Sequence, residues 1–178
     1  MKIIKPAFEI ITPIDELSIL GTIEAVGRTC YKSEGSITAE SCIGFVQRII
    51  DRGHEAVIEH YNITVRLTND RGVSHEEVRH RIASYAQEST RYCNYSKDKF
   101  DNEVTYIDIA GGMKLDPVVK KYDPEKTASI YYEWLAACED AERHYLKMLE
   151  LGATPQIARS ALNNSTKTRL NNKPCKCQ

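Results

Sequence analysis

The sequence predicts an α+β fold in which helices pack on a small, mostly antiparallel sheet, with a long helix near the C-terminal end. Three observations predict it. Apolar and polar residues alternate over 61–68, which is typical of a strand with one buried face. Segments with apolar residues at helical spacing lie on both sides of that strand. Farther along, residues 123–152 run without interruption from a helix-start signal to a helix-stop signal.

Two helices are expected before this strand. Residues 14–26 show helical spacing, and Thr38 can cap a second helix that runs to Arg52, where Gly53 ends it. The apolar face of the second helix is predicted to contain Cys42, Phe45, Val46, Ile49 and Ile50. A helix with such a face buries it against the core of the domain.

After the strand, "NDRG" is predicted to turn the chain into a charged segment, "SHEEVRHRIASYAQESTRY". Ser74 and Glu77 have the spacing of a capping box, so a helix is expected to begin there. One polar stripe of that helix would contain Glu76, Arg79, His80, Ala83 and Gln87. The small alanine would leave room for a flat ligand beside a guanidinium group, but a solvated helix face has the same composition. Spacing alone leaves both interpretations open.

A second strand is expected around residues 104–109, followed by the long helix. Asp123 can cap this helix, Pro124 suits its first position and Gly152 ends it. At about 1.5 Å per residue the helix would be roughly 40 Å long, which exceeds what a domain of this size needs. We therefore expect part of it to contact another subunit. Thr154 is predicted to cap a further short helix that carries Arg159.

The charge balance limits the expected partners. The 178 residues carry 24 basic and 25 acidic side chains, a formal net charge of -1, so no broad field attracts nucleic acid or an anionic membrane. The sequence contains no run of about 20 apolar residues of the kind that spans a membrane, and a cytoplasmic location is expected. The cysteines are scattered in a way that fits reduced thiols. The pair Cys175 and Cys177 lacks the second ligand pair of a structural zinc site.

Two segments contain candidate binding residues. The stretch "SYAQESTRY" places Ser89 and Arg91 in a loop where a hydroxyl, backbone N–H groups and a guanidinium could cradle a phosphate. Ser89 has no evident base beside it, so a nucleophilic role is not favoured. In "GHEAVIEH", His54 and His60 lack the spacing of a zinc-binding helix, and no metal site is expected.

The combination of motifs is more specific than any one of them. The sequence "RHRIASYAQES" has Arg-His-Arg followed by seven residues and a serine, and "GRTCYKS", "GHEAVIEHYNITVRL" and "PQIARSALNNSTKT" accompany it. In these motifs the chain resembles the flavin-dependent thymidylate synthases, over roughly residues 12–168. The domain expected from this resemblance covers residues 1–168, and residues 169–178 form a divergent tail.

The resemblance implies a methyltransferase of nucleotide biosynthesis. In that family, methylenetetrahydrofolate donates a carbon to C5 of dUMP, FAD supplies a hydride, NADPH reduces the flavin again, and the product is dTMP. No cysteine nucleophile is needed. The resemblance also implies a homotetramer with active sites between subunits, which agrees with the length of the expected helix.

The same resemblance assigns roles to individual residues. The residues implied to bind dUMP are Glu76, Arg79, Gln87, Glu88, Ser89, Thr90, Arg91 and Arg159. The residues implied to bind FAD are His54, Arg79, His80, Arg81 and Gln87. Reduced flavin and nucleotide are both anionic, which makes arginine a natural counter-charge for each.

One departure from the family leaves alternatives open. Family members continue with a stretch that carries asparagine contacts to FAD and an arginine thought to polarise the uracil ring, and its place would lie beyond Gln178. No catalytic residue is therefore assigned. The first alternative is a nucleotide- or flavin-binding relic without activity. The second is a metal-dependent nucleotide phosphohydrolase that uses His54, His60 and His80. A flavin spectrum would favour the family, and bound divalent metal would favour the hydrolase.

Overall fold

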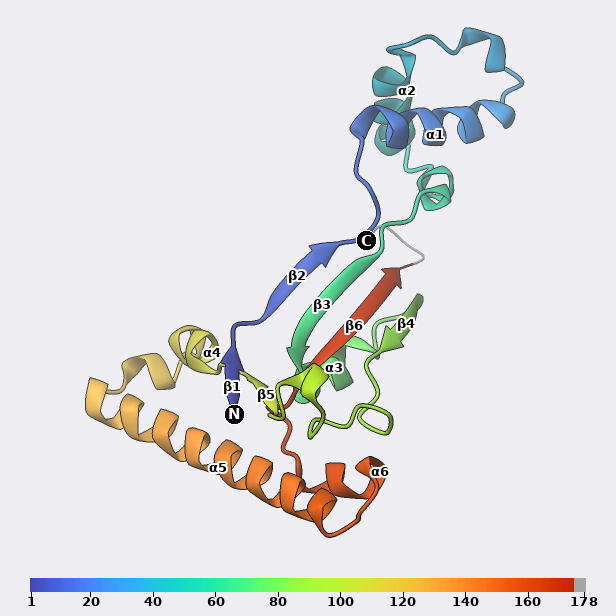
Figure 1. The fold of residues 1–178 in the computed structure, drawn as a ribbon. Coiled ribbons are helices and arrows are strands. Elements are labelled where there is room, and N and C mark those ends of the chain that lie inside the picture. The colour runs from blue at the N-terminus through green and yellow to red at the C-terminus, as the bar shows by residue number, and fades with distance from the viewer. Residues whose placement is uncertain (175–178) are drawn as a thin grey trace. The chain divides into compact units, whose positions relative to one another are not determined.

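The computed structural model describes residues 1–174, so the expectation for Cys175 and Cys177 lies outside the described residues. Helices and strands alternate along the chain (Figure 1). The strands are β1 (Lys2–Ile4), β2 (Ala7–Ile10), β3 (Val65–Asp70), β4 (Ala83–Gln87), β5 (Thr105–Ile107) and β6 (Lys167–Pro174). The α-helices are α1 (Glu16–Thr29), α2 (Ser41–Asp51), α3 (Arg71–Glu77), α4 (Ala110–Leu115), α5 (Pro124–Glu150) and α6 (Pro155–Ala158). Short 3₁₀ turns are η1 (Glu34–Ser36), η2 (Glu55–His60), η3 (Asp98–Phe100), η4 (Val119–Lys121) and η5 (Arg159–Ala161).

The strands form two small sheets. The larger sheet has the order β2-β3-β6-β4, and β2 and β6 run opposite to the β3 strand between them (Figure 1). The smaller sheet pairs β1 with β5 in parallel, with Lys2 opposite Thr105 and Ile4 opposite Ile107. The predicted α+β class with a mostly antiparallel sheet is confirmed. The two N-terminal strands were not predicted from the sequence.

The chain divides into two compact units. The first contains residues 1–8, 67–79 and 86–170, and the second contains residues 9–66, 80–85 and those from 171 onward. Four of the five boundaries fall within β2, β3, β4 and β6, so each of these strands contributes to both units, and the fifth lies between α3 and β4. The buried core of the first unit consists of Tyr95, Val104, Tyr106, Cys138, Tyr145 and Ala158. The buried core of the second consists of Ile23, Phe45, Val46 and Ile49.

In the second unit, α1 and α2 pack closely because a glycine stands at their contact. A Cβ atom on Gly27 would lie 2.7 Å from the ring of Phe45, so only glycine allows this approach. The side chain of Glu24 is fully buried and accepts hydrogen bonds from Arg28, at 2.7 Å, and from Ser41, at 2.8 Å. The contact with Ser41 joins α1 to the start of α2, whereas the contact with Arg28 lies within α1.

The predicted apolar face of α2 is confirmed for four of its five residues. Cys42, Phe45, Val46 and Ile49 are buried, whereas Ile50 is 54% exposed. Gly53 adopts a φ of 67° just after the helix, which fits its predicted role at the C-terminus. The predicted cap was wrong, because α2 begins at Ser41 rather than after Thr38. The hydroxyl of Ser41 instead accepts a hydrogen bond from the backbone N–H of Thr38, at 2.8 Å.

The predicted charged helix is largely wrong. Helix α3 ends at Glu77, and residues 83–87 form strand β4, where half-buried and exposed side chains alternate. Pairing of this segment with β6 outweighs its helical spacing, because propensity is weaker than tertiary context. The proposed stripe from Glu76 to Gln87 is therefore not one helix face. The segment "NDRG" is also not a separate turn, since β3 runs to Asp70, whose carboxylate caps α3 by accepting from the N–H of Val73 at 2.7 Å.

The long helix was predicted correctly. Asp123 caps α5 by accepting from the N–H of Lys126 at 2.8 Å, Pro124 occupies the first turn, and Gly152 follows the helix with a φ of 94°. Trp134 on α5 donates to the hydroxyl of Ser165, at 2.8 Å, just before β6. Among the described residues, no helix combines the length and the apolar character that crossing a membrane requires.

Strand β6 continues past the expected domain boundary after Thr168. Leu170 is fully buried, and β6 lies between β3 and β4 in the sheet. Residues 169–174 therefore belong to the sheet, and the expectation that residues 169–178 form a divergent tail stays a prediction.

The burial of Leu170 gives a test of the role of β6. Replacement of Leu170 by alanine leaves a cavity beside a central strand, so the free energy of unfolding should fall by about 2 to 5 kcal/mol. The matched control is Lys173→Ala, an exposed position on the same strand, where the change should stay within about 0.5 kcal/mol. Urea denaturation of both variants measures this, and similar small changes in both would show that β6 does not support the core.

Candidate nucleotide-binding site

A polar pocket lies in the first unit, beside the loop that follows β4. Its volume is about 400 Å³. The residues that line it come from three stretches of the chain and are Arg71, Thr90, Gln156, Arg159, Ser160, Leu162, Asn163 and Asn164. In the part of the chain that the structure describes, this lining contains two guanidinium groups and no carboxylate. The pocket therefore has the chemistry of an anion site.

The start of the loop 87–91 is held by hydrogen bonds to neighbouring elements. The side-chain amide of Gln87 donates to the hydroxyl of Ser74 on α3, at 2.9 Å, and to that of Thr168 on β6, at 3.3 Å. The backbone N–H of Glu88 donates to the carbonyl of Arg169, at 2.8 Å. These contacts tie both α3 and β6 to the loop that carries most of the predicted nucleotide-binding residues.

An ion pair strengthens the same attachment. The ammonium group of Lys167 lies 2.6 Å from the carboxylate of Glu88, and the two side chains are only 15% and 16% exposed. The hydroxyl of Tyr95 donates to the same carboxylate at 3.3 Å. Burial, and next the charge of Glu88, raises the pKa of the Tyr95 phenol well above its usual range, so it remains a protonated donor.

The loop and the helical segment around α6 meet at the pocket. The guanidinium group of Arg159 donates to the buried hydroxyl of Thr90, at 3.3 Å, although the two residues are 69 positions apart. The guanidinium group of Arg91 donates to the side chain of Gln156, also at 3.3 Å. Thr90, Gln156 and Arg159 all line the pocket, so Arg91 is positioned next to it.

The structure thus brings together part of the predicted dUMP set. Gln87, Glu88, Thr90, Arg91 and Arg159 form one connected group in the first unit. The hydroxyl of Ser89 faces its own loop and accepts from the N–H of Arg91, at 3.3 Å.

Two further residues of the predicted dUMP set lie in the first unit outside the pocket lining. Glu76 lies on α3, and Arg79 follows that helix, and both side chains are exposed. Neither is among the residues that line the polar pocket. Their roles toward dUMP and FAD stay predictions.

The remaining predicted FAD residues lie in the second unit. His54 lines a separate pocket of about 480 Å³, and its Nδ1 lies 3.2 Å from the hydroxyl of Tyr31. His80 and Arg81 are exposed, and the carbonyl of His80 accepts from the hydroxyl of Tyr85 at 2.7 Å.

Metal and thiol chemistry find little support in the described residues. No group of three or more His, Cys, Asp and Glu side chains within residues 1–174 is arranged to hold a metal ion, so His54, His60 and His80 do not form such a site. Burial raises the pKa of the thiols of Cys93 and Cys138, which keeps them neutral and makes them weak nucleophiles.

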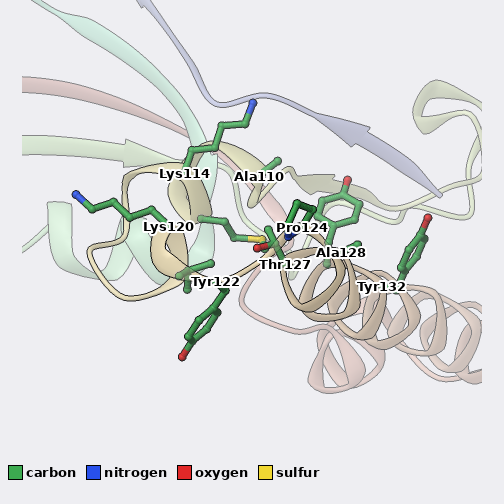
Figure 2. A pocket seen from close by; sticks show the side chains of 11 residues that line it. Ala110, Lys114, Lys120, Tyr122, Pro124, Thr127, Ala128 and Tyr132 are labelled. Carbon is green, nitrogen blue, oxygen red and sulfur yellow. The ribbon is translucent and has the colours of Figure 1, made fainter.

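A second cavity, larger than the polar pocket, lies elsewhere in the first unit and was not predicted. Its volume is about 590 Å³, and it lies between the α4–η4 segment and the start of α5. Tyr122, Tyr131 and Tyr132 give it an aromatic lining, whereas the ammonium groups of Lys114 and Lys120 point away from its apolar side chains (Figure 2). It contains none of the predicted site residues, whereas the smaller polar pocket contains Thr90 and Arg159.

Arg71 is the charged lining residue that sequence reasoning missed, and the uncharged residues Gln156, Ser160, Leu162, Asn163 and Asn164 were not predicted either. Arg71 lies in "NDRG", which was interpreted as a turn, and no pattern in the sequence distinguishes it from a surface arginine. The one sequence feature that sets Arg71 apart is its position between a predicted strand and the capping signal of the next predicted helix.

Comparisons with known proteins agree with the resemblance. Residues 15–172 match the family model described as "Thymidylate synthase complementing protein", so the match extends beyond Thr168 into β6. The chain is 30% identical over 155 residues to the flavin-dependent thymidylate synthase of Geobacter sulfurreducens, which covers 83% of this chain and 60% of that protein. It is 29% identical over 158 residues to the enzyme of the same name from Mycobacterium avium, covering 83% and 59%. The chain therefore spans about 60% of the length of these relatives.

A solved structure has a similar fold. The crystal structure of the UMP/dUMP methylase PolB from Streptomyces cacaoi, bound with 5-Br dUMP, superposes with a TM-score of 0.73 at 18% identity. The match covers 98% of this chain and 75% of that chain. At this identity the similarity establishes the fold.

The ion pair between Lys167 and Glu88 can be tested against an exposed pair of the same chemistry. Replacement of Lys167 by methionine leaves a poorly solvated carboxylate, so the free energy of unfolding should fall by about 2 to 4 kcal/mol. Lys147 and Glu150 lie 3.0 Å apart but are 57% and 69% exposed, so Lys147→Met should cost less than about 1 kcal/mol. Equal losses in the two variants, measured by urea denaturation, would contradict the structural role of the Lys167 pair.

Proposed function

Because the chain belongs to the family of thymidylate synthase complementing proteins, we propose that it methylates dUMP to dTMP in a flavin-dependent reaction. The observation that carries this proposal is the contact between Arg159 and Thr90. It joins two motifs distant in the sequence at one polar pocket with the size of a small-molecule site. The pocket and its loop supply the groups that a nucleotide phosphate needs.

Names of related proteins support the substrate and the cofactor class. The curated relatives are named as flavin-dependent thymidylate synthases, and the structural neighbour is named as a UMP/dUMP methylase. The chain spans about 60% of the relatives' length, so the complete activity is part of the proposal. We include methylenetetrahydrofolate as the carbon donor and NADPH as the reductant, as the resemblance implies.

In this proposal the polar pocket binds the phosphate end of dUMP. Arg159 lines the pocket, and Arg91 lies beside it through its contact with Gln156. Guanidinium groups donate two parallel hydrogen bonds to phosphate oxygens, which fixes the orientation as well as the affinity. The hydroxyl and amide groups of Ser160, Asn163 and Asn164 provide further donors at the same surface.

The residues proposed for FAD fit an anionic cofactor in their chemistry. Arg79, His80 and Arg81 are exposed cationic or titratable side chains, and none of the ion pairs among the described residues includes them. His54 and Tyr31 add hydrogen-bonding groups at the pocket of the second unit. When bound, FAD supplies the hydride that completes the methyl group. The protein side chains bind, orient and balance charge.

In the chemical step, the attack of C5 of dUMP on the carbon donor, we expect this chain to contribute positively charged side chains. Negative charge develops on the uracil ring when C5 attacks the carbon donor, and a fixed cation or hydrogen-bond donor beside the ring stabilises that charge. Arg79 is the residue that we propose to bind both nucleotide and flavin. No cysteine nucleophile is part of this proposal, as the resemblance implies.

We also propose that the chain acts as a homotetramer with active sites between subunits. The long helix α5 spans 27 residues and leaves Tyr132 67% exposed. This proposal rests on the resemblance and on the length of the helix, and Tyr132 is one exposed side chain on the surface that a second subunit could contact. Size-exclusion chromatography with light scattering measures the assembly directly.

The function itself is tested by separating binding from turnover. The purified protein, supplied with FAD, should show a flavin absorbance spectrum after removal of free cofactor, and calorimetry should detect binding of dUMP. With methylenetetrahydrofolate and NADPH present, tritium should be released from C5 of labelled dUMP. Binding of both ligands without tritium release would favour a binding protein over an enzyme. Failure to bind either ligand would contradict the proposal.

A second test concerns Arg79. Replacement of Arg79 by alanine should weaken binding of dUMP and FAD by about 1.5 to 3 kcal/mol, the value of a lost charged hydrogen bond. Stability should change little, because the side chain is exposed. Arg48→Ala, at an exposed position on α2, is the matched control and should retain both affinities. Unfolding of the Arg79 variant, with normal binding by its folded fraction, would instead identify Arg79 as a structural residue.

A further inference from the structure

Arg71 is held in place by its backbone rather than by its side chain. Its N–H group donates to the carbonyl oxygens of Asn164, at 2.9 Å, and Thr166, at 3.1 Å. The next residue, Gly72, also donates to the carbonyl of Asn164, at 3.3 Å. These bonds attach the start of α3 to the segment before β6 and do not depend on the identity of the side chain at position 71.

One buried nitrogen of the Arg71 guanidinium group, the Nη1 atom, has no hydrogen-bond partner among the described residues. Within the same part of the chain, none of the ion pairs includes Arg71. Arg28 provides the contrast, since its guanidinium binds the buried carboxylate of Glu24 at 2.7 Å. A partly buried cation without a counter-charge costs free energy, so a structure that keeps one usually has a ligand for it.

The surroundings of Arg71 indicate what that ligand is. Arg71 and Arg159 line the same pocket of about 400 Å³, together with polar groups and no carboxylate from the described residues. A phosphate monoester carries a charge of about -1.5 to -2 at pH 7, which two guanidinium groups can balance. Each phosphate of a dinucleotide such as FAD is a diester-like group with a single charge, so it matches this pair less well.

We infer that Arg71 is a further substrate-binding residue, whose guanidinium group binds the 5′-phosphate of the nucleotide together with Arg159. This inference rests on the proposed function and deepens it, because it assigns the phosphate monoester to a defined pair of arginines. It also explains the unpaired Nη1 atom: the charge of Arg71 is balanced when the nucleotide is present. Free inorganic phosphate has the same chemistry and is expected to bind weakly at the same place.

The test compares ligands with and without the phosphate on the full chain. Calorimetry measures the affinities of the wild-type protein and the Arg71→Met variant for dUMP, deoxyuridine and inorganic phosphate. The variant should bind dUMP about 10- to 100-fold more weakly, the range expected for a lost charge-assisted hydrogen bond. Its affinity for deoxyuridine should stay within twofold. Arg143→Met, an exposed position on α5, is the control and should leave all three affinities unchanged.

Stability provides a second readout that separates binding from a structural role. Methionine retains most of the length of arginine and removes the unpaired buried donor, so the ligand-free Arg71→Met variant should unfold at a temperature equal to or above that of the wild type. Addition of dUMP should raise the unfolding temperature of the wild type more than that of the variant. A structural arginine would give the opposite result in the ligand-free protein.

The outcomes distinguish this inference from the proposed function. Normal binding of dUMP by the Arg71→Met variant would overturn the inference and leave the function intact. If the Arg71→Met variant fails to fold, the Arg71→Lys variant is measured instead, because lysine keeps the charge but cannot donate two parallel hydrogen bonds. A wild-type affinity of this variant for dUMP would overturn the inference. A several-fold loss of dUMP affinity with normal deoxyuridine binding would support it. A wild-type protein that binds inorganic phosphate through Arg71 but not dUMP would retain the anion site and remove the proposed function. Binding of none of the three ligands by the wild type would overturn both.

Discussion

The ion pair between Lys167 and Glu88 is the interaction on which the candidate site depends. It joins the loop after β4 to the central strand β6, and both side chains are largely excluded from solvent. With Tyr95 donating to the same carboxylate, the first residues of the loop are held in one position. Thr90 and Arg91 then lie where Arg159 and Gln156 can contact them. The position of the binding loop in this protein thus depends on a partly buried charge pair next to it.

The same unit shows how charge is divided between structure and function. Glu88 is neutralised by Lys167 within the protein, whereas Arg71 and Arg159 line a pocket with no carboxylate from the described residues. Charged side chains that pair within the protein, such as Glu88 and Lys167, contribute to the fold. Charged side chains without a counter-charge in the pocket are available to bind a ligand. The cost of an unpaired guanidinium group in the ligand-free protein is offset when an anion binds, which couples nucleotide affinity to stability.

Local signals in the sequence predicted much of the fold. Asp123 and Pro124 marked the start of α5, and the spacing of Phe45, Val46 and Ile49 marked the buried face of α2, because caps and amphipathic spacing act within a few residues. Strand β4 was missed because its hydrogen bonds come from β6, some 80 positions later, and a charged segment with helical spacing gives no sign of that partner. The candidate site shows the same difference between local signals and contacts between residues far apart in the sequence. The motif identified Thr90 and Arg91, but only the fold showed Arg71 beside Arg159.

The central claim is that the pocket lined by Arg71, Thr90 and Arg159 binds the phosphate of dUMP. A crystal structure of the protein with dUMP tests it most directly. We predict phosphate oxygens within about 3 Å of the guanidinium groups of both Arg71 and Arg159, the distance of a charge-assisted hydrogen bond. A well-ordered dUMP whose phosphate lies outside this pocket, with the Arg71 side chain still unpaired, would contradict it.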